Sequence, residues 1–169
     1  METTNVMAGG RETGQYLTFQ LGRDVFGVDI REVREIIQFV APTPIPMTPD
    51  FILGVMNLRG EVVPVIDLAR RFGLESTQVK RRSCTIVMEP REGGRLRHLG
   101  IIVDSVYEVR DVDAADIEPA PSFGADIRLD FIAGMARLDG RFVILLAADK
   151  ALSFEEMVLL AEACAEGEG

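Results

Sequence analysis

The chain carries an internal duplication, which limits the folds open to it more than any other feature of its sequence. Residues 51–54 match residues 131–134, and Gly60 matches Gly140 at the same offset. A second constant offset relates earlier positions in the two halves, pairing Gly27 with Gly100, Val33 with Val106 and Glu35 with Glu108. Several matches in one order indicate two similar structural units, each too small to bury a large core alone.

Short runs of alternating apolar and polar residues predict β-strands in both halves. In the first run Leu17, Phe19 and Leu21 share one face, as in a half-buried strand. Apolar residues between Ile30 and Ile37 fall at helical spacing and predict a short helical turn. We expect strands at residues 15–21, 25–30, 54–58 and 61–66, and again at 83–89, 99–109, 131–138 and 141–148.

Units of about five short strands close best as small barrels, because closure leaves few free edges. The predicted fold is therefore all-β, with two five-stranded β-barrel lobes sharing a hydrophobic core, short helical turns and a C-terminal α-helix. We place one domain at residues 15–165, with lobe 1 at about 15–80, lobe 2 at about 81–150 and the helix at 153–165, opened by a capping box of Ser153 and Glu156. Residues 1–14 are expected to be disordered.

The charge balance restricts the partners of the protein. Acidic residues number 27 against 18 basic ones, giving a formal net charge of −9. Nucleic-acid and anionic-lipid surfaces are bound largely through Lys and Arg, so neither is expected as a partner. The sequence shows neither a secretory signal nor an apolar run of spanning length. Cys84 and Cys164 lie far apart, which favours reduced thiols and a cytoplasmic location.

Few residues suggest catalysis. His98 is the single histidine and, beside a charged loop, is interpreted as a surface residue. Metal-ligand clusters and phosphate-binding motifs are absent from the sequence, so no metal or cofactor is expected. Asp29, Asp67 and Asp104 lie at strand ends and are interpreted as caps and turn acceptors. A hydrolase using Asp29 or Asp104 as an acid or base stays an alternative.

The duplication lets each half serve as a control for the other. Gly60 and Gly140 agree in the two turns, whereas Arg59 is replaced by Asp139. The turn therefore requires glycine but not arginine, which makes Arg59 a candidate functional residue. Pro64, where the other half has Ile144, predicts an edge strand or a bulge near Arg59, of the kind that suits a docking surface.

The same region resembles a known family. The run Gly54-Val55-Met56-Asn57-Leu58-Arg59-Gly60-Glu61-Val62-Val63-Pro64-Val65-Ile66-Asp67-Leu68 is similar to the hallmark of the CheW-like domain. The resemblance continues at residues 29–36, 100–104, 117–121 and 153–157, and covers about residues 15–165.

This resemblance implies two SH3-like five-stranded barrels without catalytic activity. Such proteins couple the cytoplasmic tips of methyl-accepting chemoreceptors to the regulatory domain of the histidine kinase CheA, and reach the membrane only through the receptors. Self-association in rings is a further expectation. The resemblance also implies that substituting Arg59 weakens receptor docking and leaves kinase binding nearly intact. A β-barrel regulator that binds a small metabolite is the alternative function.

By position, the receptor-facing groove falls on Val33, Gly54, Asn57, Arg59 and Cys84. Kinase contacts fall on Glu35, Ile36, Gly100, Val106 and Val109, although Val106 and Val109 suit the core of a barrel better.

Overall fold

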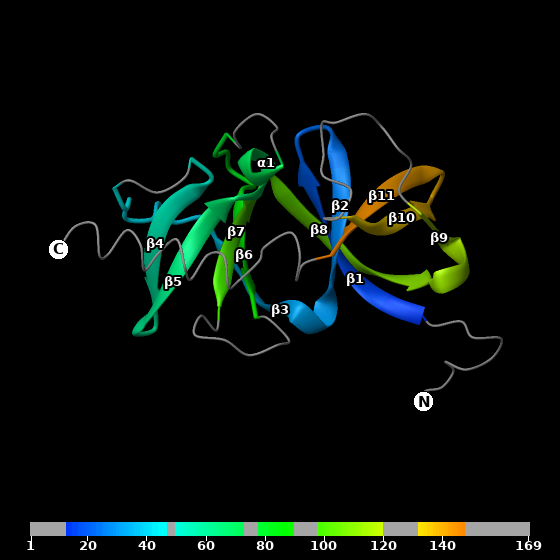
Figure 1. The fold of residues 1–169 in the computed structure, drawn as a ribbon, viewed down its shortest axis with the longest axis horizontal. Coiled ribbons are helices and arrows are strands. Elements are labelled where there is room, and N and C mark those ends of the chain that lie inside the picture. Colours follow the sequence, from blue (N-terminus) through cyan, green and yellow to red (C-terminus); the bar gives the residue numbers. More distant parts are fainter. Residues whose placement is uncertain (1–12, 47–49, 73–77, 90–97, 120–131, 148–169) are drawn as a thin grey trace.

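The computed structural model describes residues 13–46, 50–72, 78–89, 98–119 and 132–147, which form two β-sheets (Figure 1). The strands are β1 (Thr13–Leu21), β2 (Asp24–Asp29), β3 (Val33–Gln38), β4 (Ile52–Leu58), β5 (Glu61–Asp67), β6 (Cys84–Met88), β7 (Leu99–Val103), β8 (Ser105–Asp113), β9 (Ile117–Glu118), β10 (Ile132–Leu138) and β11 (Arg141–Leu146). Described helical segments are α1 (Leu68–Arg71) and the 3₁₀ turns Ile30–Glu32 and Ala114–Asp116. Sheet A has the order β8-β1-β2-β11-β10-β9, and sheet B the order β3-β6-β7-β5-β4.

Each sheet combines strands from both halves of the duplicated chain. Sheet A adds the hairpin β1–β2 of the first half to strands of the second half, and sheet B adds the hairpin β6–β7 of the second half to strands of the first half. The β1–β2 hairpin pairs with β8 and, in parallel, with β11. The β6–β7 hairpin pairs in the same way with β3 and β5. In Figure 1 the blue hairpin β1–β2 accordingly lies beside the orange strand β11. The predicted lobes 15–80 and 81–150 are therefore wrong as contiguous units, because the duplication shows which segments are alike and not which segments pair.

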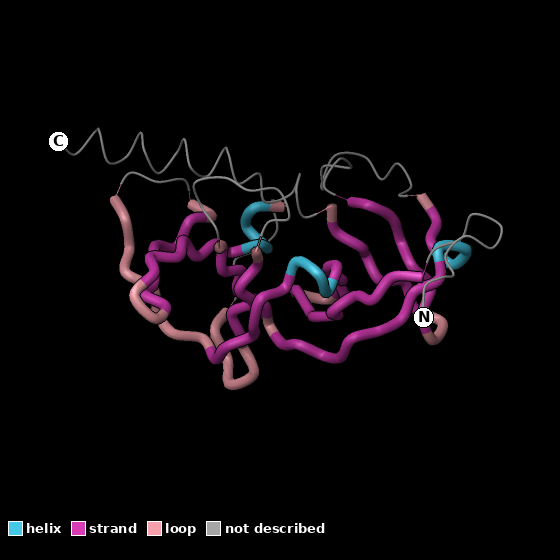
Figure 2. Tube along the Cα trace, turned by 90° about the horizontal axis from the view of Figure 1, so that it is seen from below, coloured by secondary structure: helices cyan, strands magenta, loops and turns pink. Residues whose placement is uncertain are grey.

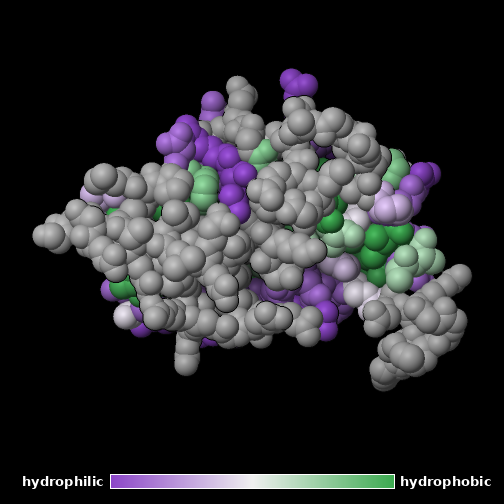
Figure 3. All heavy atoms as spheres, in the orientation of Figure 1, coloured by the Kyte–Doolittle hydropathy of each residue, from purple (hydrophilic) through white to green (hydrophobic). Residues whose placement is uncertain are grey.

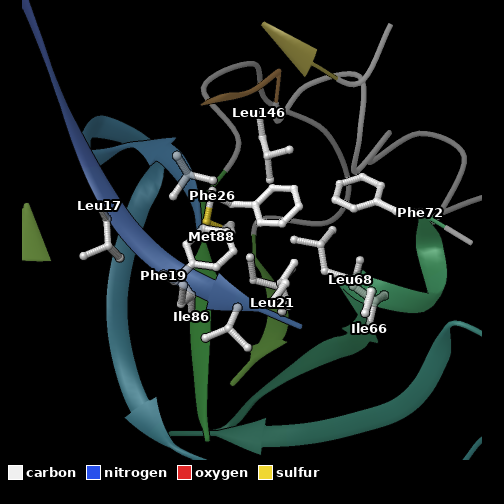
Figure 4. Packing of buried hydrophobic residues seen from close by; sticks show 14 of the residues in the cluster. Leu17, Phe19, Leu21, Phe26, Ile66, Leu68, Phe72, Ile86, Met88 and Leu146 are labelled. Carbon is white, nitrogen blue, oxygen red and sulfur yellow. The ribbon is translucent and has the colours of Figure 1, made fainter. Parts of the chain in front are cut away.

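Three apolar clusters hold the sheets together. The main core lies between them and joins β1 and β2 of sheet A to β6 and β7 of sheet B and to α1 (Figure 4). Phe19, Phe26 and Phe72 stack in succession there, with ring centroids 6.1 and 5.8 Å apart. A second cluster, around Val63 and Val87, contains residues of all five strands of sheet B, and a third contains residues of all six strands of sheet A. Each sheet thus curves around a small core of its own.

The exchanged hairpins are buried on both faces. In β6 and β7, Ile86 and Ile101 face the main core, while Val87 and Ile102 face the core of sheet B. Both strands are fully or largely buried, and Thr85 is their one polar residue, as expected of strands covered on two sides. Figure 2 shows the two groups of strands side by side along the long axis of the molecule.

The all-β class is confirmed, and the inward curvature of both sheets agrees with barrel lobes; SH3-like closure stays a prediction. Sheet A has a sixth strand, the two-residue β9, beyond the predicted five. The predicted helical turn is confirmed only at Ile30–Glu32, because residues 33–38 pair with β6 as β3. The predicted strand 99–109 breaks at Asp104, whose Oδ2 accepts a hydrogen bond from the Gly22 N–H (2.6 Å).

The predicted C-terminal helix at 153–165 lies outside the described residues, and so do residues 1–12 of the segment 1–14 that is expected to be disordered. Residues 13 and 14 are ordered, because β1 begins at Thr13. Within the described part of the chain, no helix is long and apolar enough to cross a membrane.

The hairpin exchange predicts how the chain responds to division. Residues 1–80 and 81–169, expressed separately, should each lack a cooperative thermal transition, because each sheet loses the central hairpin supplied by the other half. Mixing the two fragments should restore the transition, which circular dichroism measures. A fragment that unfolds cooperatively by itself would contradict the shared core.

Candidate docking surface

The turn between β4 and β5 presents Arg59 to solvent. Arg59 and Gly60 both adopt left-handed backbone conformations (φ 51° and 88°), as a two-residue hairpin turn of the I′ type requires. The Asn57 Oδ1 accepts a hydrogen bond from the Gly60 N–H (2.9 Å), which fixes the turn. The Arg59 side chain is 64% exposed. Two predicted receptor-facing residues, Asn57 and Arg59, thus lie together at one end of sheet B.

An ion pair ties this turn to the opposite edge of the sheet. The Arg59 guanidinium donates to the carboxylate of Glu35 on β3, although β3 and β4 are the two edge strands of sheet B. In sheet A the turn residue Asp139 accepts from Arg110 on the edge strand β8 (2.9 Å). The two lobes therefore share this link but carry it with opposite charge at the turn.

Apolar side chains flank both turns on the outer face of the hairpins. Val62, paired with Asn57, is 62% exposed, whereas Val63 points into the core of sheet B. Phe142, the counterpart of Val62, is 47% exposed, and the Arg137 guanidinium lies over the Phe142 ring (5.0 Å to the centroid). Apolar residues of sheet A accordingly reach the surface near β9 and β10 in Figure 3.

The remaining predicted receptor-facing residues lie elsewhere. Val33 and Cys84 are half-buried and pack against the main core. The Cys84 Sγ donates to the Arg82 carbonyl (3.3 Å), and burial raises the pKa of the Cys84 thiol. Gly54 is buried, with φ 147°, and a Cβ on it would lie 2.0 Å from the Thr43 carbonyl oxygen. Its conformation lets the segment at Thr43 form a bridge to β4, so the structure gives Gly54 a packing role.

The predicted kinase-facing residues divide into exposed and buried positions. Ile36 on β3 and Val109 on β8 are counterparts in the duplication, and they are 42% and 43% exposed. Val106 is half-buried against the main core, as its core assignment predicts, but the same assignment is wrong for Val109. Gly100 is buried, and a Cβ there would lie 2.9 Å from Cγ2 of Thr85. Gly100 therefore serves packing and offers no surface to a partner.

The interpretation of His98 as a surface residue is wrong. Its side chain is 6% exposed and lies between two carboxylates, with Nδ1 2.5 Å from Glu61 Oε2 and Nε2 3.2 Å from Glu89 Oε1. Arg34 on β3 donates to the same Glu89 oxygen (3.0 Å). Hydrogen bonds from Arg34 and then from His98 lower the pKa of Glu89. The duplication held a signal for this burial, since the counterpart of His98 is the apolar Val25.

Pro64 lies on an inner strand, so the predicted edge is wrong for β5 as a whole, although residues 61–64 pair with β4 and not yet with β7. β5 runs between β7 and β4. The parallel pairing of β5 with β7 begins at Val65, immediately after the proline, whereas the equivalent strand β11 is already paired at Val143. Proline thus shortens the ladder inside the sheet because it cannot donate a backbone hydrogen bond.

The three aspartates considered for acid–base chemistry accept hydrogen bonds from backbone N–H groups. Asp29 accepts from Arg31 (2.9 Å), Asp67 from Ala69 (3.1 Å) and Asp104 from Gly22 (2.6 Å). These contacts agree with caps and turn acceptors. Among the described residues, no three His, Cys, Asp or Glu side chains are grouped so as to hold a metal ion.

Comparisons with known proteins by family, by sequence and by fold all find similarity to CheW proteins. The model of the CheW-like domain family matches residues 15–156. Chemotaxis protein CheW of Klebsiella aerogenes is 37% identical over 160 residues, covering 95% of this chain and 94% of that protein. Chemotaxis protein CheW of Rhizobium meliloti is 34% identical, covering 88% and 91%. The crystal structure of scaffolding protein TtCheW from Thermoanaerobacter tengcongensis matches with a TM-score of 0.71 and 36% identity, covering 80% of this chain and 84% of that one.

Gly54→Ala should destabilise the protein by about 2 kcal/mol or more, because the methyl group would displace the segment at Thr43 and strain the backbone. Chemical denaturation measures the change. Gly22→Ala is the matched control: Gly22 also has positive φ (62°), but a Cβ there meets nothing within 4 Å. Its cost should be about 1 kcal/mol, and equal losses in the two variants would contradict the packing role of Gly54.

Proposed function

Because the chain belongs to the CheW-like domain family, we propose that it is a non-catalytic coupling protein of bacterial chemotaxis. In this proposal it links the cytoplasmic tips of chemoreceptors to the regulatory domain of the histidine kinase CheA, acts in the cytoplasm and reaches the membrane only through receptors. The names of its relatives, Chemotaxis protein CheW and scaffolding protein TtCheW, support a coupling or scaffolding role. No cofactor is required, and ring-like self-association stays part of the proposal.

The presentation of Arg59 is the observation that carries the receptor assignment. The same fold position accepts aspartate in the other lobe, so neither the turn nor its ion pair demands arginine. Asn57 nevertheless fixes the turn through Gly60, and Glu35 pairs with the Arg59 side chain, near the exposed Val62. A fixed cation next to an apolar side chain suits a protein partner, since arginine and apolar anchors are common centres of binding energy.

The proposed receptor surface therefore centres on Asn57, Arg59 and Val62. Val33, half-buried against the main core and paired with Met88, extends it along β3. Cys84, also half-buried there, begins β6 at the opposite end of sheet B, so it belongs to the proposed surface only as a more distant part. Gly54 contributes by shaping β4 rather than by contact.

The proposed kinase surface uses the two edge strands. Ile36 on β3 and Val109 on β8 expose apolar side chains at equivalent positions, with Glu35 and Val106 beside them in the sequence. Glu35 is also the ion-pair partner of Arg59, so the receptor and kinase surfaces meet at one contact. A shift imposed by a receptor on Arg59 would reach β3 directly, which is the differential contact that coupling between two sites requires.

Because Glu35 belongs to both surfaces, substituting Arg59 is expected to weaken kinase binding slightly instead of leaving it intact. Arg59→Asp, which copies the residue of the other lobe, should weaken binding of a receptor cytoplasmic fragment by about tenfold or more. Binding of the CheA regulatory domain should weaken only about twofold to threefold, because Glu35 keeps its place on β3 and loses one exposed partner. Titration calorimetry measures both affinities.

Asp139→Arg is the matched control. It places an arginine against Arg110, which removes the equivalent ion pair in sheet A, and should leave receptor binding unchanged. Equal loss of receptor binding in both variants, or none in Arg59→Asp, would refute the receptor surface. Thermal stabilisation by a small metabolite without protein partners would favour the alternative of a metabolite-binding regulator.

A further inference from the structure

A chain of charged side chains runs around the end of sheet B that carries Arg59. Its contacts join residues on β3, at the end of β6, at the start of β7 and at the start of β5 to the β4–β5 turn. In order, the members are Arg59, Glu35, Arg34, Glu89, His98 and Glu61. The closest approach between Arg34 and Glu35 is 3.9 Å, and the other contacts are hydrogen bonds.

His98 is the buried centre of this chain, and its hydrogen bonds constrain its protonation. Both ring nitrogens face carboxylate oxygens, of Glu61 at 2.5 Å and Glu89 at 3.2 Å. Ionised carboxylates only accept hydrogen bonds, while a neutral imidazole donates one and an imidazolium two. Both contacts are therefore satisfied when both nitrogens carry protons, and the buried cation is then paired on two sides. Glu61 and Glu89 are the charged groups against the ring in the described part of the chain, with Arg34 beyond Glu89.

The fold itself does not require this arrangement. In sheet A the positions of His98 and Glu61 are occupied by Val25, which packs in an apolar cluster, and Arg141. The contact of Arg34 with Glu89 is replaced there by a neutral hydrogen bond from the Tyr107 hydroxyl to Gln20 Oε1 (2.7 Å). The link between turn and edge strand is thus common to both lobes, whereas the histidine belongs to the lobe with Arg59.

His98 holds the residues next to both members of the Arg59–Glu35 pair. Glu61 directly follows the turn and pairs with Leu58 to close it. Glu89 holds Arg34, the neighbour of Glu35 on β3. Because the β5–β7 ladder begins only at Val65, this end of β5 is joined to β7 through the contact of Glu61 with His98.

We propose that His98 is a positioning residue for the Arg59 docking surface, and that its doubly protonated ring makes receptor docking weaken as pH rises. Loss of one proton leaves a ring nitrogen facing a carboxylate without a hydrogen bond, so the ring no longer holds either Glu61 or Glu89, whose side chains are 41% and 50% exposed. The turn and β3 then lose their common anchor. This inference rests on the proposed function for its partner. The clamp, meaning the contacts of His98 with Glu61 and Glu89, can be tested without a partner.

The first measurement uses the single histidine as a probe. Nitrogen NMR of the intact protein should show both His98 ring nitrogens protonated at about pH 6. Raising the pH to about 8.5 should shift the Gly60 amide resonance much more than that of Gly140, its counterpart in sheet A. In His98→Val, which copies Val25, the Gly60 resonance should lose this response. An unprotonated ring nitrogen at the lower pH, or equal responses of the two glycines, would overturn the clamp.

The second measurement follows binding of a receptor cytoplasmic fragment over the same pH range. Affinity of the wild-type protein should fall about fivefold to tenfold toward the upper end, the order expected for the loss of one ordinary hydrogen bond. His98→Val should bind with an affinity that does not follow pH. If that variant does not fold, Glu61→Gln takes its place, because it removes one of the two charges that favour the imidazolium.

The proposed function and the role of His98 can be refuted separately. A wild-type protein that binds no receptor fragment at any pH would refute the proposed function, while the Gly60 and Gly140 resonances would still judge the clamp. Receptor binding with the same pH dependence in the wild type and in His98→Val would overturn the role of His98 and leave the proposed function standing.

Discussion

Everything else in the structure depends on two hairpins that are buried on both faces. β1–β2 and β6–β7 each complete the sheet of the opposite half, and each turns its other face to the main core. Apolar side chains on two faces cannot be satisfied in an isolated half, because hydrophobic burial is the main favourable term in folding. The duplicated chain therefore folds as one unit with three connected cores, and a displacement of one sheet bears on the other.

This construction gives the two lobes similar shapes and different surfaces. Both turns have the same left-handed backbone, and both are tied to an edge strand by an ion pair. The charges are reversed, however, and only sheet B continues the pair into a network with a buried histidine. A protein that must hold two different partners at defined positions gains specificity from such reversal, since like charges oppose the wrong partner.

The sequence predicted the elements better than their pairing. Local patterns located most strands, but they predicted β3 as a helical turn, merged β7 with β8 and did not predict β9. The duplication singled out Arg59, because the two turns can be compared directly in the sequence. The hairpin exchange depends on parallel contacts between β2 and β11 and between β5 and β7, for which the sequence carries no local mark. His98 was misjudged for the same reason: its partner Glu61 lies on another strand, and burial depends on what covers a residue rather than on its neighbours in the chain.

If this chain couples receptors to a kinase, the autophosphorylation of that kinase should depend on it. A CheA-type kinase is combined with receptor-containing membranes, with and without the protein, beside a coupling protein known to work with that kinase. Our account predicts strong activation that depends on the protein and that attractant suppresses. No activation by the folded protein, while the known coupling protein activates the same kinase and the kinase regulatory domain binds this chain, would contradict it.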